Sequence, residues 1–397
     1  MNFSIWKKVR NLKFMYKKIT KTKNMSYDNI SRKYFGTPNK AGDIARLNNN
    51  IDEGEILVYV DDDVIDEENS EISLTIEDKT VISFPEYSLI DNLNAINGAV
   101  FIINKENNNY NFKIGQQAQI REKNNKFLNG RISNVKNCFN KRANWQQLEI
   151  KSHAGILLDS NVPYPLQYSN PTIKSILTAI AESFGQKITF SDEKELEEVF
   201  VNEIGTSFTA SILENAFDFM NRICISRGLL LTDTGDGLFV GRYNPDTQEK
   251  INLLSSECTG LDSMYWEGTG DGLARYYEIN SQYPEVASAT IQIPFPLPII
   301  KRFNSNDFNA KDLPTIGNNI ACREIGKHFK LTAVLNELYD IKSGSFAIVK
   351  NPDVGIEEET EFVVSSVYRK HPNQTVLQMT LPCSYTYQLP EKLPLCC

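Results

Sequence analysis

Residues 170–242 constrain the fold most, because two helix patterns occur there and each is followed by a strand pattern. In the first helix the apolar residues recur at spacings of three and four: Ile173, Ile176, Leu177, Ile180 and Phe184. This spacing predicts one apolar helix face. We expect Asn170 to cap the helix, Pro171 to be its first residue and Gly185 to end it.

The second helix is predicted to open at residues 205–207 (Gly-Thr-Ser) and to close at Gly228. Its apolar stripe has six residues: Ile212, Leu213, Ala216, Phe217, Met220 and Ile223. We expect Cys224 to lie in the buried face of this helix. Glu214, on the predicted helix Ser211–Ile225, is expected to be a solvated charge.

A β-hairpin is predicted after this helix, with its turn at Asp233–Gly237, where Asp and Gly permit positive φ. The resulting αβαββ unit spans residues 162–243. It contains no recognisable cofactor motif or nucleophile. We therefore expect it to hold other domains in a fixed geometry.

Residues 72–161 form short strand patterns separated by Gly- and Asn-rich loops. The predicted strands are Ile72–Ile76, Val81–Ile82, Ala99–Ile103, Phe112–Ile114, Ala118–Glu122, Leu128–Val135 and Gln147–Lys151. Strands at this spacing predict a small β-barrel or sandwich. His153 follows the last strand without a Ser or Asp at a nucleophile turn, so we expect a structural role for it.

Residues 244–390 are again rich in strand patterns. The predicted strands are Tyr276–Gln282, Ala287–Ile293, Leu331–Leu335, Phe346–Lys350, Glu361–Tyr368 and Thr375–Leu381. A helix is predicted at Asn318–Phe329. The Pro-rich segment Pro294–Pro298 is expected to be extended and not a central strand. His328 and His371 are separated by several strands and accompany no carboxylate cluster, so we expect no metal site.

The N-terminal part has a strand-helix-helix-strand pattern within residues 14–62. The predicted elements are Phe14–Ile19, Tyr27–Phe35, Lys40–Leu47 and Glu55–Val60. Residues 1–13 form a basic arm, for which a solvated face and a polyanion-docking arm stay open. Residues 63–71 belong to an acidic stretch that reads as a linker.

Composition excludes several function classes. The chain of 397 residues is long enough for two to four domains, and its net charge of −8 argues against nucleic-acid binding by the whole chain. The seven Cys form no C-x-x-C pair, which favours free thiols in a reducing compartment and disfavours zinc. The sequence contains no run of eighteen apolar residues, and its first residues lack signal-peptide features, so we expect no membrane span.

The N-terminal pattern resembles a LysM domain. The matching residues are Ile30, Tyr34-Phe35-Gly36, Ile44-Ala45, Asn48 and Gly54-Glu55-Ile56-Leu57. The family commonly has Gly-Asp-Thr-Leu where this chain has residues 24–27 (Asn-Met-Ser-Tyr), and Pro-Gly where it has Glu53-Gly54. The resemblance implies five candidate glycan-binding residues: Asn24, Ser26, Tyr27, Asn49 and Ile51. The departures favour a docking clip over a working peptidoglycan binder, and both uses stay open.

An ordered set of segments within residues 72–387 resembles the tail baseplate hub proteins of Mu-like contractile phages. These share a plan with the T-even hub and the upper part of VgrG spikes. The segments are 130–135, 148–152, 205–207, 213–216, 227–231, 235–240, 277–282, 351–356, 362–367 and 375–382, with a helix containing Glu324. The chain departs from the family in its basic N-terminus and its Pro-rich segment.

The hub resemblance implies an α+β fold that is mainly β. A LysM-like βααβ module would be followed by two hub-type β-barrel domains and an αβαββ connecting domain. By analogy the first barrel spans 72–161, and the second domain, with a helical insert, spans 244–390 before a tail at 391–397. The second barrel would combine strands near 276–293 and 331–381.

The same resemblance implies a structural role in a virion tail baseplate, assembled in the host cytoplasm. Family hubs are homotrimers whose six barrels match a hexameric tail tube to a trimeric spike. Implied partners are further copies of the chain, the tail tube or tube-initiator protein, the central spike protein and the baseplate wedge proteins. Peptidoglycan is a further candidate partner. DNA would pass only as cargo, through a channel for which we hypothesise an acidic lining.

No catalytic residue, cofactor or metal is expected, so the chain is interpreted as a non-enzyme. Two alternatives stay open. A cell-wall-binding or hydrolysing tail protein would need paired carboxylates, a Cys/His pair or a metal triad. A hub or spike of a tail-like bacteriocin or secretion particle would share the fold.

Overall fold

The structure is a computed structural model, and parts of the chain are described in it. The described residues are 15–21, 26–27, 30, 54–60, 72–81, 84–105, 111–122, 125–140, 143–162, 172–197, 210–211, 213–254, 260–281, 286–304, 312–371 and 374–394. Across these residues, no helix is long and apolar enough to cross a membrane.

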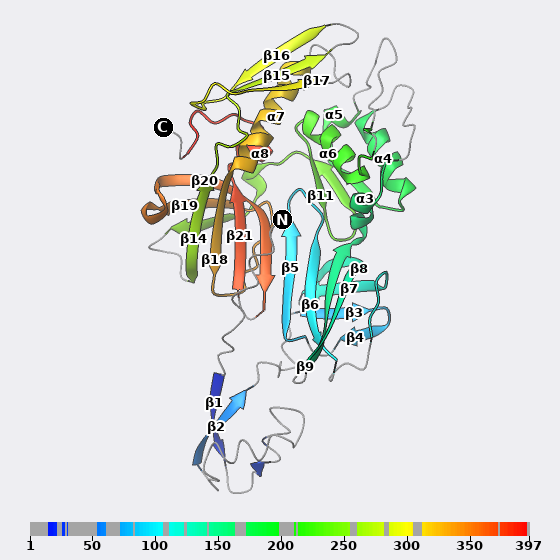
Figure 1. The fold of residues 1–397 in the computed structure, drawn as a ribbon, viewed down its shortest axis with the longest axis vertical. Helices are drawn as coiled ribbons and strands as arrows, with labels where there is room; N and C mark the ends of the chain where they lie inside the picture. The colour runs from blue at the N-terminus through cyan, green and yellow to red at the C-terminus, as the bar shows by residue number, and fades with distance from the viewer. Residues whose placement is uncertain are drawn as a thin grey trace.

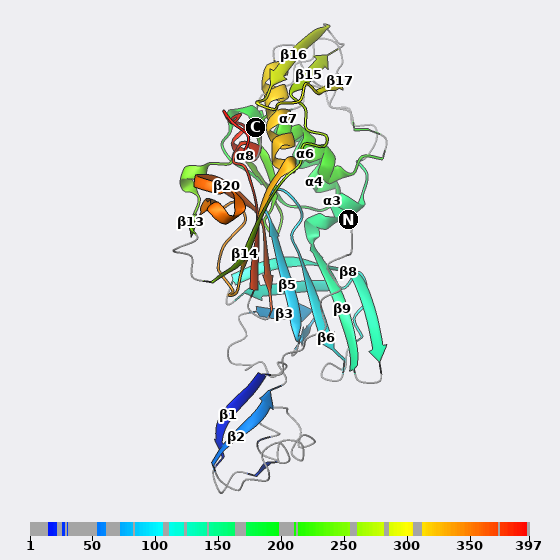
Figure 2. The ribbon, with the colours of Figure 1, turned by 60° about the vertical axis from the view of Figure 1, so that its left-hand side comes forward.

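A sheet of thirteen strands forms two barrels and joins them (Figures 1 and 2). Its main path runs β14-β18-β21-β20-β5-β6-β9-β8-β7-β3-β4, and β19 connects β20 to β13. Strands β3 to β9 build the first barrel, whereas β13, β14 and β18 to β21 build the second. The expected fold class, mainly β with an αβαββ unit, is confirmed.

The first barrel contains seven strands. They are β3 (Ile72–Ile76), β4 (Lys79–Val81), β5 (Glu86–Asn92), β6 (Gly98–Asn104), β7 (Gln117–Glu122), β8 (Asn125–Asn140) and β9 (Ala143–Ser152). Its core contains fully buried apolar residues from several strands, among them Leu74, Phe101, Ile120 and Leu148.

For this barrel, one strand was missed and one predicted strand was wrong. Strand β5 was not predicted, although its Tyr87 and Leu89 alternate into the core. The predicted strand Phe112–Ile114 is not a strand. Instead, the side chain of Gln146 forms the hydrogen bonds of the Phe112 backbone. Its Oε1 accepts from Phe112 N at 3.3 Å, and its Nε2 donates to Phe112 O at 3.0 Å. A side-chain amide thus replaces a neighbouring strand.

The second barrel contains six strands. They are β13 (Lys250–Leu254), β14 (Leu261–Gly268), β18 (Phe329–Leu335), β19 (Phe346–Asn351), β20 (Ile356–Lys370) and β21 (Gln374–Thr380). A short turn η6 (Pro352–Val354) links β19 to β20. Strands β13 and β14 were not predicted.

The expectation that strands near 276–293 belong to the second barrel was wrong. Strands β15 (Tyr276–Ser281), β16 (Ala287–Gln292) and β17 (Ile300–Asn304) form a separate sheet at one end of the molecule (Figure 1). This sheet packs on α7 (Leu313–His328). A Cβ at Gly317 would lie 2.9 Å from Ile279 Cγ1, so the glycine lets the sheet approach the helix closely. The Pro-rich segment between β16 and β17 is not a strand, as predicted.

The αβαββ unit lies between the two barrels in sequence. Its elements are α4 (Ile173–Ser183), β10 (Ile188–Phe190), α5 (Lys194–Glu197), α6 (Ala216–Ser226), β11 (Leu230–Asp233) and β12 (Leu238–Gly241). The sheet order is β10-β12-β11, with β10 parallel and β11 antiparallel to β12. Short turns η3 (His153–Gly155), α3 (Ile156–Asp159), η4 (Pro245–Thr247) and α8 (Cys383–Thr386) complete the elements.

The start of α4 differs from the prediction. Thr172 caps the helix, since its side chain accepts from Ser175 N at 3.0 Å and Ser175 Oγ accepts from Thr172 N at 2.9 Å. The reciprocal pair satisfies two backbone donors, which explains why the cap is not Asn170. Asn170 and Pro171 lie outside the described residues. Gly185, with φ of 66°, follows the helix end as predicted.

Helix α6 begins later than predicted. Asn215 caps it by accepting from Asp218 N at 2.8 Å, so the helix does not open at residues 205–207. Leu213 has φ of 67° and is 79% exposed, so it is not part of the apolar stripe. Glu214 precedes the helix, and its carboxylate is paired rather than solvated. Its Oε1 lies 2.9 Å from Arg222 Nε, and its side chain is 14% exposed. Cys224 is buried as predicted.

The N-terminal part is described in pieces. Strand β1 (Met15–Lys21) pairs antiparallel with β2 (Gly54–Val60), close to the two predicted strands. Tyr27 and Ile30 are helical, and the rest of the two predicted helices lies outside the described residues. The LysM-like interpretation therefore stays a prediction.

Candidate functional site at the junction of the two barrels

Strand β20 of the second barrel also pairs with a strand of the first barrel. Its first half pairs with β19 and its second half with β21, both inside the second barrel. Its last five residues also pair antiparallel with β5 of the first barrel, so that residues 366–370 lie opposite residues 88–92. Backbone pairing therefore joins the two barrels directly.

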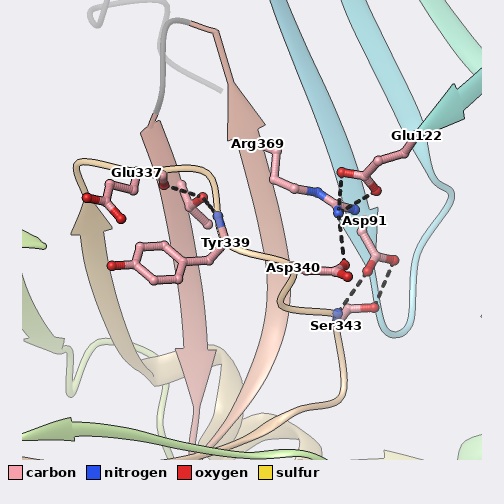
Figure 3. Close-up of polar contacts among 8 residues, drawn as sticks. Asp91, Glu122, Glu337, Tyr339, Asp340, Ser343 and Arg369 are labelled. Atoms are coloured by element: carbon pink, nitrogen blue, oxygen red, sulfur yellow. Dashed lines mark hydrogen bonds and ion pairs between the residues drawn. The ribbon is translucent and has the colours of Figure 1, made fainter. Parts of the chain in front are cut away.

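A buried ion pair reinforces this ladder. Arg369 of β20 places Nη1 2.6 Å and 2.8 Å from the two carboxylate oxygens of Glu122, the last residue of β7 (Figure 3). The guanidinium carbon lies 5.3 Å from the ring centroid of Phe127, and Asp340 Oδ1 lies 3.8 Å from Nη1. The Arg369 side chain is 5% exposed, so Glu122 supplies the charge that compensates a buried cation.

A second polar contact crosses the junction from the loop between β18 and β19. Ser343 donates its N–H to one oxygen of Asp91 at 2.8 Å and its hydroxyl to the other oxygen at 2.9 Å (Figure 3). Thr375 fixes the loop, because its Oγ1 accepts from Tyr339 N at 3.0 Å and donates to Glu337 O at 2.8 Å. The loop is thus tied to β21 on one side and β5 on the other.

The αβαββ unit binds the first barrel through Asp233. Its carboxylate accepts from Asn97 N at 2.8 Å, from Gly235 N at 2.8 Å and from the Ser152 hydroxyl. Asn97 Nδ2 donates in return to Asp233 O at 2.8 Å. Burial raises the pKa of Asp233 above its usual value, and the hydrogen bonds from Ser152, Asn97 and Gly235 oppose that shift.

The same unit also contacts the second half of the chain. Arg227 Nη1 lies 3.2 Å from Asp312 Oδ2, just before α7. The Tyr387 hydroxyl donates to Leu229 O at 3.2 Å. These contacts, with those of Asp233, connect the αβαββ unit to both sides of the barrel junction.

A groove of about 580 Å³ lies beside the junction, between the second barrel, α6, α7 and the β5–β6 turn. Its charged lining residues are Arg323, Lys327, Lys330 and Glu267. Only one of these is a carboxylate, so the described lining offers no carboxylate pair for glycoside hydrolysis. Across the described residues, no group of three or more His, Cys, Asp and Glu could hold a metal ion.

The predicted glycan-binding residues are only partly described. Ser26 is exposed and Tyr27 is half-buried at a helical position. The carbonyl of Ser26 accepts from Ile30 N at 3.1 Å. Asn24, Asn49 and Ile51 lie outside the described residues, so the glycan site stays a prediction.

The three histidines do not converge. His153 lies in η3 after β9, and burial lowers its pKa. His328 ends α7, and burial likewise lowers its pKa. His371 follows β20, and its ring stacks on Tyr87 at 5.5 Å between centroids. Each thus belongs to a different part of the structure.

The junction residues were not singled out from the sequence. One signal was present, because Val367 and Arg369 occupy alternate positions of one strand and both are buried. A charged residue at an inward strand position needs a partner. The sequence does not say which acid supplies that partner, since Glu122 lies 247 positions away.

Comparisons with known proteins identify the fold. No family model and no curated protein matches the chain. A 43 kDa tail protein of prophage MuSo2 from Shewanella oneidensis is 16% identical, with a TM-score of 0.65 over 79% of this chain and 99% of that chain. A tail protein from Neisseria meningitidis MC58 is 16% identical, with a TM-score of 0.66 over 80% and 98%. Prophage tail protein gp18 from Listeria monocytogenes EGD-e is 9% identical, with a TM-score of 0.55 over 78% and 94%. The chain therefore has the fold of these phage tail proteins, in agreement with the resemblance to phage tail proteins expected from the order of its segments.

Proposed function

We propose that the chain is a structural hub protein of a contractile phage tail baseplate. Three copies form a ring of six barrels that joins the hexameric tail tube to the trimeric central spike. The protein resides in the virion tail baseplate after assembly in the host cytoplasm. This role requires no catalytic group.

The single observation that carries the proposal is the edge-to-edge joining of two barrels in one chain. A threefold assembly of such chains presents six similar barrels, which suits contact with sixfold symmetry on one side and threefold symmetry on the other. The fold likeness to prophage tail proteins supports the setting. By this reasoning the partners are the tail tube or tube-initiator protein, the spike protein and the wedge proteins, and DNA passes only as cargo.

The location in the particle tests this function. An affinity tag at the C-terminus of the full chain would be labelled with gold on purified tail particles and imaged by electron microscopy. We expect one cluster of label where the tube meets the spike. Label along the tube, on fibres, or only on material that does not sediment with tails would overturn the proposal.

The N-terminal LysM-like segment is proposed to be a docking clip to neighbouring baseplate proteins. Sedimentation with insoluble peptidoglycan tests this use against glycan binding. The full chain is compared with a variant lacking residues 1–62, whose circular dichroism is checked first. We expect neither to sediment with the cell wall. Sedimentation of the full chain alone would favour a cell-wall-binding tail protein instead.

A further inference from the structure

The two barrels share one strand plan. The first contains the order β5-β6-β9-β8-β7 and the second the order β14-β18-β21-β20-β19. In each, the fourth strand is the longest, forms a hairpin with the third and pairs through its first half with the fifth. This correspondence makes β8 the equivalent of β20, and β14 the equivalent of β5.

A shared bulge aligns the two plans residue by residue. The register of β8 against β9 shifts at Ser133, and that of β20 against β21 shifts at Ser365. Each serine hydroxyl donates to a carbonyl of the partner strand at 3.0 Å, which is Glu149 O for Ser133 and Gln378 O for Ser365. Residues 134–138 of β8 therefore correspond to residues 366–370 of β20.

The correspondence also holds on the other side of the sheet. Ser88 of β5 lies opposite Val100, which lies opposite Glu149. Tyr265 of β14 lies opposite Thr332, which lies opposite Gln378. Residues 265–269 therefore correspond to residues 88–92 of β5.

The edges of the second half of β8 and of β14 have no partner strand among the described strands, although the equivalent edges of β20 and β5 pair with each other. The second half of β20 pairs with β5, whereas in the described structure residues 134–140 of β8 pair with β9 alone. Likewise, β14 pairs with β18 alone among the described strands. One chain thus carries both halves of a second junction, one in each barrel.

We propose that β8 of one copy pairs antiparallel with β14 of a second copy, in the register that β20 and β5 use within the chain. The inference rests on the proposed function, because it names the contact through which copies build the ring. Within the chain Tyr368 lies opposite Ile90 and Lys370 opposite Ser88. The equivalent pairs between copies are Lys136 opposite Glu267 and Cys138 opposite Tyr265.

The side chains in this register are complementary. Lys136 and Glu267 are both exposed and carry opposite charges. Lys136 lies over the ring of Trp145 at 6.0 Å, which orients its amine on that face of the hairpin. Tyr265 is 55% exposed, and Phe139, just beyond the paired residues, is 79% exposed. Opposite charges in facing positions stabilise antiparallel strand pairs. The exposed Tyr265 faces Cys138 in this register.

The geometry of the contact permits a closed assembly. The two edges differ, so each copy offers one to a neighbour on either side, and such head-to-tail contacts build rings or filaments. Pairing also covers two unpaired strand edges, which soluble proteins otherwise protect. The internal β20–β5 junction supplies the curvature that the contact between copies repeats.

Cross-linking tests the register. The full chain with Cys258, Cys396 and Cys397 replaced by serine would carry Tyr265→Cys opposite the native Cys138. Under mild oxidation or with a short bis-maleimide, we expect covalent dimers and trimers. Cys138→Ser in the same background should abolish them, and Thr290→Cys in place of Tyr265→Cys should not form them. Absence of cross-links for Tyr265→Cys, or equal cross-linking for Thr290→Cys, would overturn the proposal.

Charge exchange tests the same contact without cysteine chemistry. Lys136→Glu and Glu267→Lys alone should each weaken self-association of the full chain by about tenfold or more, because like charges then face each other. The double variant should regain the wild-type association measured by sedimentation. Lys194→Glu, on the exposed surface of α5, serves as a matched control and should change nothing. A wild-type chain that stays monomeric, or a double variant as weak as the single ones, would overturn the proposed pairing.

The two proposals fail in different ways. If the copies do not pair in this register while gold label still marks the tube–spike boundary, the hub function stands and the contact is wrong. If the copies pair as expected and the label lies elsewhere in the particle, the contact stands and the hub function is wrong.

Discussion

At the scale of single residues, the barrel junction depends on a buried cation. Arg369 is almost fully enclosed, and its charge is compensated by Glu122 from the other barrel. Burying an ion is costly, and losing its partner costs more than the pair contributes. Removing Glu122 would therefore leave a buried cation without its counter-charge, whereas removing Arg369 would leave a carboxylate that is more exposed.

Replacing Glu122 with Gln should lower the free energy of unfolding by about 2–4 kcal/mol, because a buried guanidinium loses its counter-charge. Urea unfolding followed by circular dichroism measures this loss. The matched control is Asp340→Asn, since Asp340 lies 3.8 Å from Arg369 but has a side chain 74% exposed. That change should stay within about 0.5 kcal/mol. Equal losses for the two variants would contradict the importance of burial here.

Asp233 predicts a pH dependence. Burial raises its pKa in the folded protein, so between the usual value of about 3.9 and the raised value the folded state keeps a proton that the unfolded state has lost. The contribution of this group to the free energy of unfolding therefore falls as pH rises through that window. Asp233→Asn lacks this titration. Its stability relative to wild type should improve from pH 3.5 toward neutrality (roughly the range in which Asp ionises), as measured by urea unfolding at each pH. A constant difference would contradict the raised pKa.

At the scale of elements, the β11–β12 hairpin turn contacts the first barrel with little space to spare. Gly235 has φ of 77°, and a Cβ there would lie 2.4 Å from Phe127 O. Its carbonyl accepts from Asn129 N at 2.8 Å. The turn therefore needs glycine for two reasons, backbone conformation and close approach to β8.

A pair of alanine variants separates these two reasons. Gly185→Ala adds a side chain at φ of 66° with no atom within 4 Å, so it should cost about 1 kcal/mol. Gly235→Ala adds the collision with β8 and should cost about 1–3 kcal/mol more. Thermal or urea unfolding of both variants measures the difference. Equal costs would show that the hairpin does not press on the barrel.

The sequence predicts elements well where the pattern is local. The helices α4 and α6, the hairpin after α6 and the strands β6, β18 and β21 follow from apolar periodicity and turn residues. It fails where a distant group decides the outcome, as when the Gln146 side chain replaces a strand at Phe112. Strands β13, β14 and β17 were missed for a different reason. Each mixes polar and apolar residues, because neither face of these strands is fully buried.

The candidate site was less predictable than the fold. In the sequence, nothing distinguishes Arg369 and Glu122 from other charged strand residues. Their contact depends on the pairing of β20 with β5, which joins segments more than 270 positions apart. Two barrels and a connecting unit were nevertheless expected, as an implication of the resemblance carried by the order of the segments. The assignment of residues 276–293 to the second barrel failed because alternation alone does not say which sheet a strand joins.

At the scale of the whole molecule, several contacts tie the two barrels and the αβαββ unit together. The β20–β5 ladder, the Ser343–Asp91 contact and the Asp233 cluster all cross between units. Units joined by buried polar contacts and a shared sheet should unfold together rather than one by one.

Hydrogen exchange tests this coupling. Peptides from β6 in the first barrel and β18 in the second should exchange through the same global opening, with similar protection. Glu122→Gln should reduce protection in both by a similar factor, because the junction contributes to each barrel. Asp340→Asn serves again as the control. Loss of protection in one barrel alone would show that the barrels are independent units.

The shared strand β20 also has a mechanical consequence. Force applied along the strand direction loads all five β20–β5 residue pairs at once, whereas force that peels the sheet sideways loads them one after another. The junction should therefore resist shear far better than peeling. In the proposed baseplate hub, the junction would therefore resist the thrust on the tail tube best with β20 aligned to that thrust.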